Sequence, residues 1–171
     1  MKRVLVIVDV QNDFVDQALG TKEAQEIIPS VIKEINSNYD AIYVTLDTHD
    51  SNYMESLEGK YLPVPHCIKN TEGWKLNPTI EEALKNKEYT VIEKPTFGSS
   101  ALVQMLTAYQ PEEITLVGLC TDICVISNAL LLRSAMYNTP IRVISKACAG
   151  VTVDKHLAAL EVMKSCQIDV L

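Results

Sequence analysis

Short apolar runs alternate with amphipathic segments along the whole chain, and this alternation is the feature that most constrains the fold. Most of the apolar runs are rich in Val and Ile and show little polar alternation, which is typical of strands buried on both faces of a parallel sheet. A shorter strand is expected at the C-terminal end. The predicted strands are Val4–Asp9, Ala41–Asp47, Tyr89–Glu93, Ile114–Leu119, Ile141–Ser145 and Ile168–Leu171.

Amphipathic helical patterns occupy the intervals between these strands. The predicted helices are approximately Lys22–Ser37, with Pro29 starting or kinking it, Asn77–Lys87, Ser99–Tyr109, Cys124–Asn138 and Val153–Ser165. Such alternation predicts a three-layer α/β/α sandwich around a central, mainly parallel sheet of about six strands, Rossmann-like in outline. At 171 residues, without a repeat or a linker, the chain is expected to form a single domain over residues 1–171.

Charge and apolar content exclude several classes of partner. The chain has 22 acidic and 15 basic side chains, a net charge of −7, so we expect no binding to nucleic acid or to an anionic membrane. No segment approaches the ~20 apolar residues of a membrane span, and Asp9 interrupts the N-terminal apolar run. A cytoplasmic protein is therefore expected. The five cysteines are scattered and odd in number, which favours reduced thiols.

Chemically reactive side chains follow the ends of the predicted strands. In sequence order these ends carry Asp9, Asp47, Glu93-Lys94 and the stretch Thr121-Asp122-Ile123-Cys124. Ligands of open α/β sheets bind outside the carboxyl ends of the strands. Two carboxylates, an ammonium and a thiol are therefore expected at one edge of the sheet.

Cys124 is the candidate nucleophile. Thr121 or Asp122 would be a suitable N-cap, which places Cys124 in the first turn of a helix. There the helix dipole is expected to lower the thiol pKa from about 8.5, and free N–H groups could hold an oxyanion. The alternative is a structural cysteine, since Cys is among the most buried residue types, and for an isolated cysteine that alternative is favoured.

Asp9 and Lys94 have two interpretations each. Asp9 could be a general base that takes the thiol proton, and Lys94 could hold that carboxylate in place. Alternatively, Asp9 caps the turn beside the polar stretch QND, and Lys94 is a solvated side chain before Pro95.

Residues 48–76 form a long connection with little periodicity, and such loops in a compact domain are usually functional or disordered. The stretch LDTHD places Asp47 and His49 two residues apart, so that both can face one side of an extended segment, and His66 follows in PVPHC. Two imidazoles and a carboxylate suit zinc, iron or manganese. Histidines that share no ligand are the alternative interpretation.

Three further residues of this connection bear on such a site. Glu58 or Glu55 could supply a further oxygen ligand. Cys67, next to His66, is expected to point away in extended backbone.

The motifs VIVDVQNDF, DTH, PHC, EKPTFGSS and VGLCTDICV occur in this order and resemble the isochorismatase-like cysteine hydrolase superfamily, and within it the nicotinamidases. The resemblance covers essentially the whole chain. It implies a catalytic triad of Asp9, Lys94 and Cys124, a cis peptide at Leu119-Cys120, and an oxyanion hole formed by the backbone N–H groups of Cys120 and Cys124. It also implies metal ligands at Asp47, His49, Glu58 and His66, and substrate contacts from Phe14 and Phe97.

The same resemblance implies hydrolysis of nicotinamide to nicotinate and ammonia through a Cys124 thioester, a step of NAD salvage. One divalent metal ion is implied, with zinc favoured and iron or manganese as alternatives. Many nicotinamidases carry an aromatic residue where this chain has Pro63, which leaves the exact amide open. The apolar stretch VISNALLLRSAM favours a homo-oligomer.

Two alternative functions remain. One is hydrolysis of another small amide, a carbamoyl or a ureido compound, by the same thiol chemistry. The other is a non-catalytic redox or interaction protein, since Cys120 and Cys124 are close in sequence and a reactive thiol can oxidise reversibly.

Overall fold

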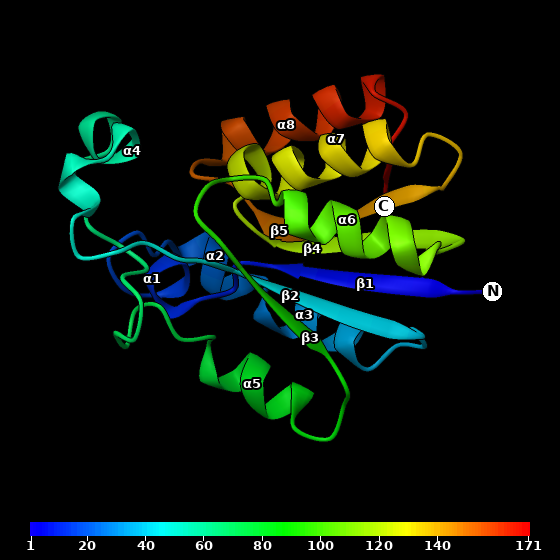
Figure 1. Ribbon diagram of the computed structural model, residues 1–171, viewed down its shortest axis with the longest axis horizontal. Helices are drawn as coiled ribbons and strands as arrows, with labels where there is room; N and C mark the ends of the chain where they lie inside the picture. Colours follow the sequence, from blue (N-terminus) through cyan, green and yellow to red (C-terminus); the bar gives the residue numbers. More distant parts are fainter.

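Six parallel strands form the central sheet of the computed structural model, which describes residues 1–171, in the order β3-β2-β1-β4-β5-β6 (Figure 1). The strands are β1 (Arg3–Val8), β2 (Ala41–Asp47), β3 (Thr90–Lys94), β4 (Glu113–Leu119), β5 (Ile141–Ala149) and β6 (Asp169–Val170). Every neighbouring pair is parallel. All six predicted strands are present.

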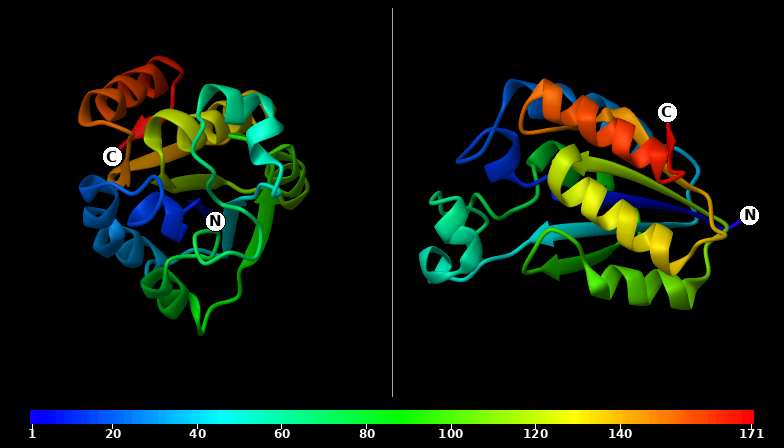
Figure 2. Two further views of the ribbon diagram at one scale, coloured as in Figure 1. Left: turned by 90° about the vertical axis from the view of Figure 1, so that its left-hand side faces the viewer. Right: turned by 90° about the horizontal axis from the view of Figure 1, so that it is seen from above.

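Helices cover both faces of the sheet, which confirms the three-layer α/β sandwich (Figures 1 and 2). One face carries α6 (Ser100–Tyr109), α7 (Ile126–Ala135) and α8 (Val153–Ser165). The other carries α2 (Lys22–Glu26), α3 (Ile28–Ile35) and α5 (Pro78–Leu84). Each face has its own cluster of 19 buried apolar residues, because successive side chains of a strand point to opposite faces.

Two differences from the predicted elements bear on the fold. The predicted helix Lys22–Ser37 divides at Ile27 into α2 and α3, with Pro29 in the first turn of α3, as a proline at a helix start favours. β5 continues to Ala149, past a shift in its register with β4. At this shift Gly118 has φ +120°, and a Cβ there would overlap the Val8 carbonyl oxygen, so only glycine fits.

The long connection after β2 is ordered and contains helices that the periodicity does not predict. These are a 3₁₀ helix (Tyr53–Glu55) and α4 (Leu57–Tyr61), and a third short helix, α1 (Asn12–Val15), follows β1. Isolated β-bridges join His49 to Ile68 and Gln11 to Leu76, which ties the connection back to the sheet edge. Helices of three to five residues are too short to show a repeating apolar pattern.

The connections from β1 and β4 leave the sheet toward opposite faces. After β1 the chain enters the layer that contains α2 and α3, whereas after β4 it enters the layer that contains α7 (Figure 1). Since β1 and β4 are neighbours, a crevice opens between their carboxyl ends, the usual ligand position in an open α/β sheet.

No helix in the structure is both long enough and apolar enough to cross a membrane. All five cysteines are free, as their scatter along the chain predicts.

Candidate active site

Asp9, Lys94 and Cys124 meet at the carboxyl end of the sheet. The Lys94 Nζ atom lies 2.6 Å from Asp9 Oδ2 and 3.4 Å from Cys124 Sγ. Thr45 Oγ1 donates a hydrogen bond of 2.6 Å to the other oxygen, Asp9 Oδ1. Asp9 is 0% exposed, Lys94 1% and Cys124 4%. The alternative interpretation of Lys94 as a solvated side chain is therefore wrong.

The register of the strands brings the ends that carry Asp9 and Lys94 together. Val8 pairs with Thr45, and Asp47 pairs with Lys94, so the ends of β1, β2 and β3 lie level. Asp9 follows Val8 with φ +48°, a left-handed conformation that Asp tolerates better than most residues. The chain therefore turns away at this point while the Asp9 carboxylate stays directed toward Lys94.

Burial controls the protonation of the thiol. It raises the pKa of Cys124 well above its usual range, and the Asp9 carboxylate raises it further. The prediction that this pKa is lowered is therefore wrong, because desolvation by burial is the largest influence on it and raises it. Burial also raises the pKa of Asp9. Burial alone would lower the pKa of Lys94, but the Asp9 charge raises it overall, so Lys94 carries a positive charge.

The turn that carries Cys124 starts differently from the prediction. Residues Thr121–Val125 form a π-helical turn that leads into α7, and its N-cap is Cys120 without a side-chain hydrogen bond. Asp122 Oδ1 instead accepts a hydrogen bond of 2.9 Å from the Val151 N–H. The predicted N-caps Thr121 and Asp122 are thus inside the turn.

Two backbone features lie beside the thiol. The Leu119-Cys120 peptide is cis, as the resemblance implies. The Cys120 N–H donates no hydrogen bond within the protein, which leaves it free to donate to a bound group. An oxyanion could therefore be held next to Cys124.

Asp47, His49, Glu58 and His66 form a second cluster, with their ligand atoms all within 4.8 Å of one another. His49 Nε2 lies 2.9 Å from Asp47 Oδ2, and His66 Nε2 lies 3.5 Å from Glu58 Oε1. The carboxylate that joins the two histidines and Asp47 is Glu58, which resolves the choice between Glu58 and Glu55.

The chemistry of this cluster fits a divalent metal ion. Asp47 Oδ1 is buried and accepts no hydrogen bond. The Val64 carbonyl oxygen lies 2.8 Å from His66 Nδ1, an arrangement that leaves Nε2 as the ligand atom. Two imidazole nitrogens and two carboxylates are a donor set for zinc, iron or manganese. Cys67 is fully buried in the apolar core and lies outside this cluster, as predicted.

Gln11 fixes the position of Asp47. This role of Gln11 was not predicted from the sequence. Its side-chain N–H₂ donates hydrogen bonds of 2.8 Å to the carbonyl oxygens of Asp47 and Trp74, and its Oε1 accepts one of 2.8 Å from the Asp47 N–H. The only signal in the sequence is a glutamine shortly after a buried strand, since a buried amide must have hydrogen-bond partners.

Two more side chains support the site and were not predicted. Asn128 Nδ2 donates a 2.8 Å hydrogen bond to the Cys124 carbonyl oxygen, which holds the turn that carries Cys124. The buried Tyr53 ring has its centroid 4.9 Å from the His49 ring and 5.0 Å from the His66 ring. Neither residue belongs to a local sequence pattern that indicates its role.

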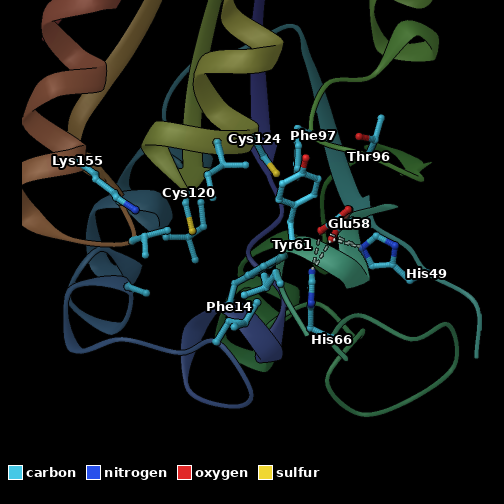
Figure 3. A pocket seen from close by; sticks show the side chains of 18 of the residues that line it. Phe14, His49, Glu58, Tyr61, His66, Thr96, Phe97, Cys120, Cys124 and Lys155 are labelled. Atoms are coloured by element: carbon cyan, nitrogen blue, oxygen red, sulfur yellow. Dashed lines mark hydrogen bonds and ion pairs between the residues drawn. The ribbon is translucent and has the colours of Figure 1, made fainter. Parts of the chain in front are cut away.

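A cavity of about 820 Å³ joins the thiol and the four-residue cluster (Figure 3). Phe14 and Phe97 line it, and the Phe14 ring lies 5.5 Å from the His66 ring. Pro63 is exposed and does not line the cavity, whereas Tyr61 does. An aromatic side chain therefore does reach this cavity, from Tyr61, two residues before the Pro63 position where many nicotinamidases carry an aromatic residue.

Comparison with known proteins identifies the family. Residues 3–171 match the Isochorismatase domain. The chain belongs to the isochorismatase family. This isochorismatase-family protein is 32% identical to the uncharacterized isochorismatase family protein PncA of Bacillus subtilis (strain 168), over 94% of the present chain and 93% of that relative.

A nicotinamidase/pyrazinamidase sequence and a solved structure also resemble this member of the isochorismatase family. The nicotinamidase/pyrazinamidase of Mycobacterium tuberculosis (strain ATCC 25618 / H37Rv) is 27% identical over 99% of this chain and 98% of its own. The crystal structure of nicotinamidase/pyrazinamidase PncA from Bacillus subtilis matches with a TM-score of 0.85 at 29% identity, covering 99% of each chain. The isochorismatase-like fold predicted from the motifs is confirmed.

Proposed function

We propose that this protein is a metal-containing cysteine amidohydrolase that converts nicotinamide and water to nicotinate and ammonia. The observation that carries the proposal is that Cys124, which lies against the buried Asp9–Lys94 pair, lines the same cavity as the four-residue donor cluster. The names of the relatives, nicotinamidases from two bacteria, support the substrate.

Proton transfer begins the reaction. Asp9 accepts the Cys124 proton, and the sulfur attacks the carboxamide carbon. Burial and the Asp9 carboxylate raise the pKa of the thiol, so a base is needed to take its proton as the sulfur attacks. The backbone N–H groups of Cys120 and Cys124 stabilise the tetrahedral oxyanion.

Collapse of the oxyanion breaks the carbon–nitrogen bond. Asp9 returns the proton to the departing nitrogen, and ammonia leaves a thioester on Cys124. Water then hydrolyses the thioester, with Asp9 accepting the water proton and returning it to the sulfur. Lys94, whose Nζ lies 2.6 Å from Asp9 Oδ2, holds the Asp9 carboxylate in place during both formation and hydrolysis of the thioester.

Asp47, His49, Glu58 and His66 would hold the metal ion. These mixed nitrogen and oxygen donors suit zinc, iron or manganese, and we favour zinc because a given donor set generally binds Zn²⁺ more tightly than Fe²⁺ or Mn²⁺. At this place the ion would supply a Lewis-acid position for the pyridine nitrogen, which would orient the ring. Phe14 and Phe97 would contact the faces or edges of that ring.

Ammonia release from nicotinamide tests the function directly. We expect turnover by the purified protein, loss of most of that turnover after treatment with a chelator, and recovery when zinc, iron or manganese is restored. Absence of bound metal together with metal-independent hydrolysis of a carbamoyl or ureido compound would favour the alternative amidase. Absence of any amide hydrolysis would favour the redox or interaction protein.

Gln11→Leu is expected to weaken metal binding by about 10–100-fold, because groups that orient a ligand typically have effects of this size. The leucine side chain fits the volume but leaves the Asp47 backbone without its two hydrogen bonds. Competition with a chromophoric chelator measures the affinity without reference to activity. Asn12→Leu, which removes only a 2.9 Å bond to the Glu72 carbonyl oxygen, is the matched control and should bind metal normally.

We also propose that residues 1–171 act as one domain, in the cytoplasm, as a homo-oligomer. The free cysteines support a reducing compartment. The exposed side chains of Met105, Leu131 and Tyr137 support self-association. A monomeric sedimentation coefficient at micromolar concentration would contradict the oligomer.

A further inference from the structure

The cavity is larger than the proposed substrate needs. About 820 Å³ is in the range that accommodates drug-sized ligands, whereas nicotinamide is a single ring with one small substituent. The part around Cys124 and the four-residue cluster contains the groups that the proposed reaction uses. The rest of the cavity therefore has no assigned role.

An outer compartment continues beyond Cys120, away from the metal cluster. In Figure 3, Lys155 lies on one side of Cys120, while Cys124, Phe97 and His49 lie on the other. We define the outer compartment by the residues Leu19, Thr21, Ala24, Ile123, Val151 and Lys155, all of which line the cavity. They come from the α1–α2 connection, α2, the nucleophile turn, the β5–α8 connection and the first part of α8.

The chemistry of the outer compartment is apolar with one positive charge. Its walls are mainly aliphatic. Among all the residues that line the cavity, Lys155 is the only lysine or arginine. No carboxylate forms an ion pair with Lys155. Thr21 Oγ1 accepts a 3.0 Å hydrogen bond from the Ala24 N–H, which leaves its own hydrogen free to be donated.

The two ends of the cavity therefore favour different chemical groups of a ligand. One end has the Asp47 and Glu58 carboxylates with two imidazoles, and the other has the Lys155 ammonium. Cys124 lies between them (Figure 3). A molecule with a metal-binding nitrogen at one end and an anion at the other would be held with its middle at the thiol.

We propose that this site accepts carboxamides that carry an additional anionic group, and that Lys155 is the specificity-determining residue that binds that group. The inference rests on the proposed amidohydrolase function for its chemistry. The anion is carried either on the acyl part or on the amide nitrogen. In both cases the carbon–nitrogen bond breaks, a carbon–sulfur bond forms, the nitrogen leaves with the proton from Asp9, and water releases the acid.

Two probes distinguish these sources of the anion. A carboxy-substituted pyridine carboxamide places the carboxylate on the acyl part, and N-nicotinoylglycine places it on the leaving amine. We expect at least one of them to be hydrolysed. Lys155→Glu should raise the KM for the hydrolysed probe about three- to tenfold relative to the KM for nicotinamide. A solvent-exposed charge pair has a modest effect, and reversing the charge at position 155 adds repulsion.

The matched control is Lys33→Glu, which makes the same charge change on α3, away from the cavity, and should leave the KM ratio unchanged. The Lys155 effect should also diminish at high salt, since an exposed ion pair is screened. A structural role of Lys155 would not produce this salt dependence.

Three results would decide against the inference. If nicotinamide is hydrolysed but neither probe is, the outer compartment does not bind an anionic substituent. If a probe is hydrolysed and the Lys155→Glu KM ratio equals that of Lys33→Glu, Lys155 is not the specificity residue. If nothing is hydrolysed, the proposed function fails, and equal calorimetric affinity of the probes for Cys124→Ala with and without Lys155→Glu at low salt would overturn anion binding as well.

Discussion

Cys124→Ala is expected to lower kcat for nicotinamide hydrolysis by about 10⁴-fold or more, because it removes the atom that forms the thioester. The remaining groups, including the backbone N–H of Cys120, cannot form a covalent intermediate. The substitution removes one buried sulfur and leaves the Asp9–Lys94 ion pair in place, so the protein should remain folded. Ammonia release at saturating nicotinamide measures the loss.

The matched control is Cys166→Ala, which removes a partly buried thiol at the C-terminal end of α8 and should retain full activity. Mass spectrometry of the acid-quenched wild-type enzyme should show a nicotinoyl adduct on the peptide containing Cys124 and on no other cysteine peptide. Retained turnover in Cys124→Ala would contradict the assignment of the nucleophile.

Asp9→Asn is expected to lower kcat by about 10²–10⁴-fold, the usual contribution of a positioned general acid–base group. An amide cannot accept the Cys124 proton, whose pKa burial has raised, nor return a proton to the leaving nitrogen. The substitution also removes the 2.6 Å partner of the buried Lys94 ammonium and leaves only Asp47 Oδ1, at 3.6 Å, near it. Loss of a buried partner destabilises a protein by at most about 3–5 kcal/mol, and we expect a smaller loss here because Asp47 remains. Steady-state kinetics and thermal unfolding measure the two effects separately.

A double substitution separates catalysis from stability. In Asp9→Asn combined with Lys94→Met, no unpaired charge remains buried, so most of the lost stability should return. The kcat should stay as low as in Asp9→Asn alone, because the proton acceptor is still missing. Recovery of activity together with stability would mean that Asp9 has only a structural role.

Local sequence pattern predicted the fold and most of the candidate site. β2 occupies the predicted residues, and α8 does as well, because a buried strand and a capped amphipathic helix each have a continuous local pattern. Asp9, Lys94 and Cys124 could be grouped from the amino-acid sequence, since the carboxyl ends of parallel strands share one edge. That grouping needs only the order and direction of the strands.

Burial could not be predicted in the same way. The pKa of the Cys124 thiol is raised, whereas its position at a helix start predicted a lowered value. The helix dipole is a local property and can be read from the sequence. Desolvation depends on which residues from other elements surround the sulfur, and here it is the largest influence on the thiol pKa.

The amino-acid sequence by itself determined the parallel sheet, the residues at its strand ends and the family, because each of these follows from local periodicity or from a short motif. Only the tertiary structure decided that Glu58 rather than Glu55 joins the donor cluster, that Gln11 and Asn128 fix Asp47 and Cys124, and that Lys155 lines the same cavity as Cys124. These features depend on how side chains from different elements pack together, and no local pattern encodes such packing.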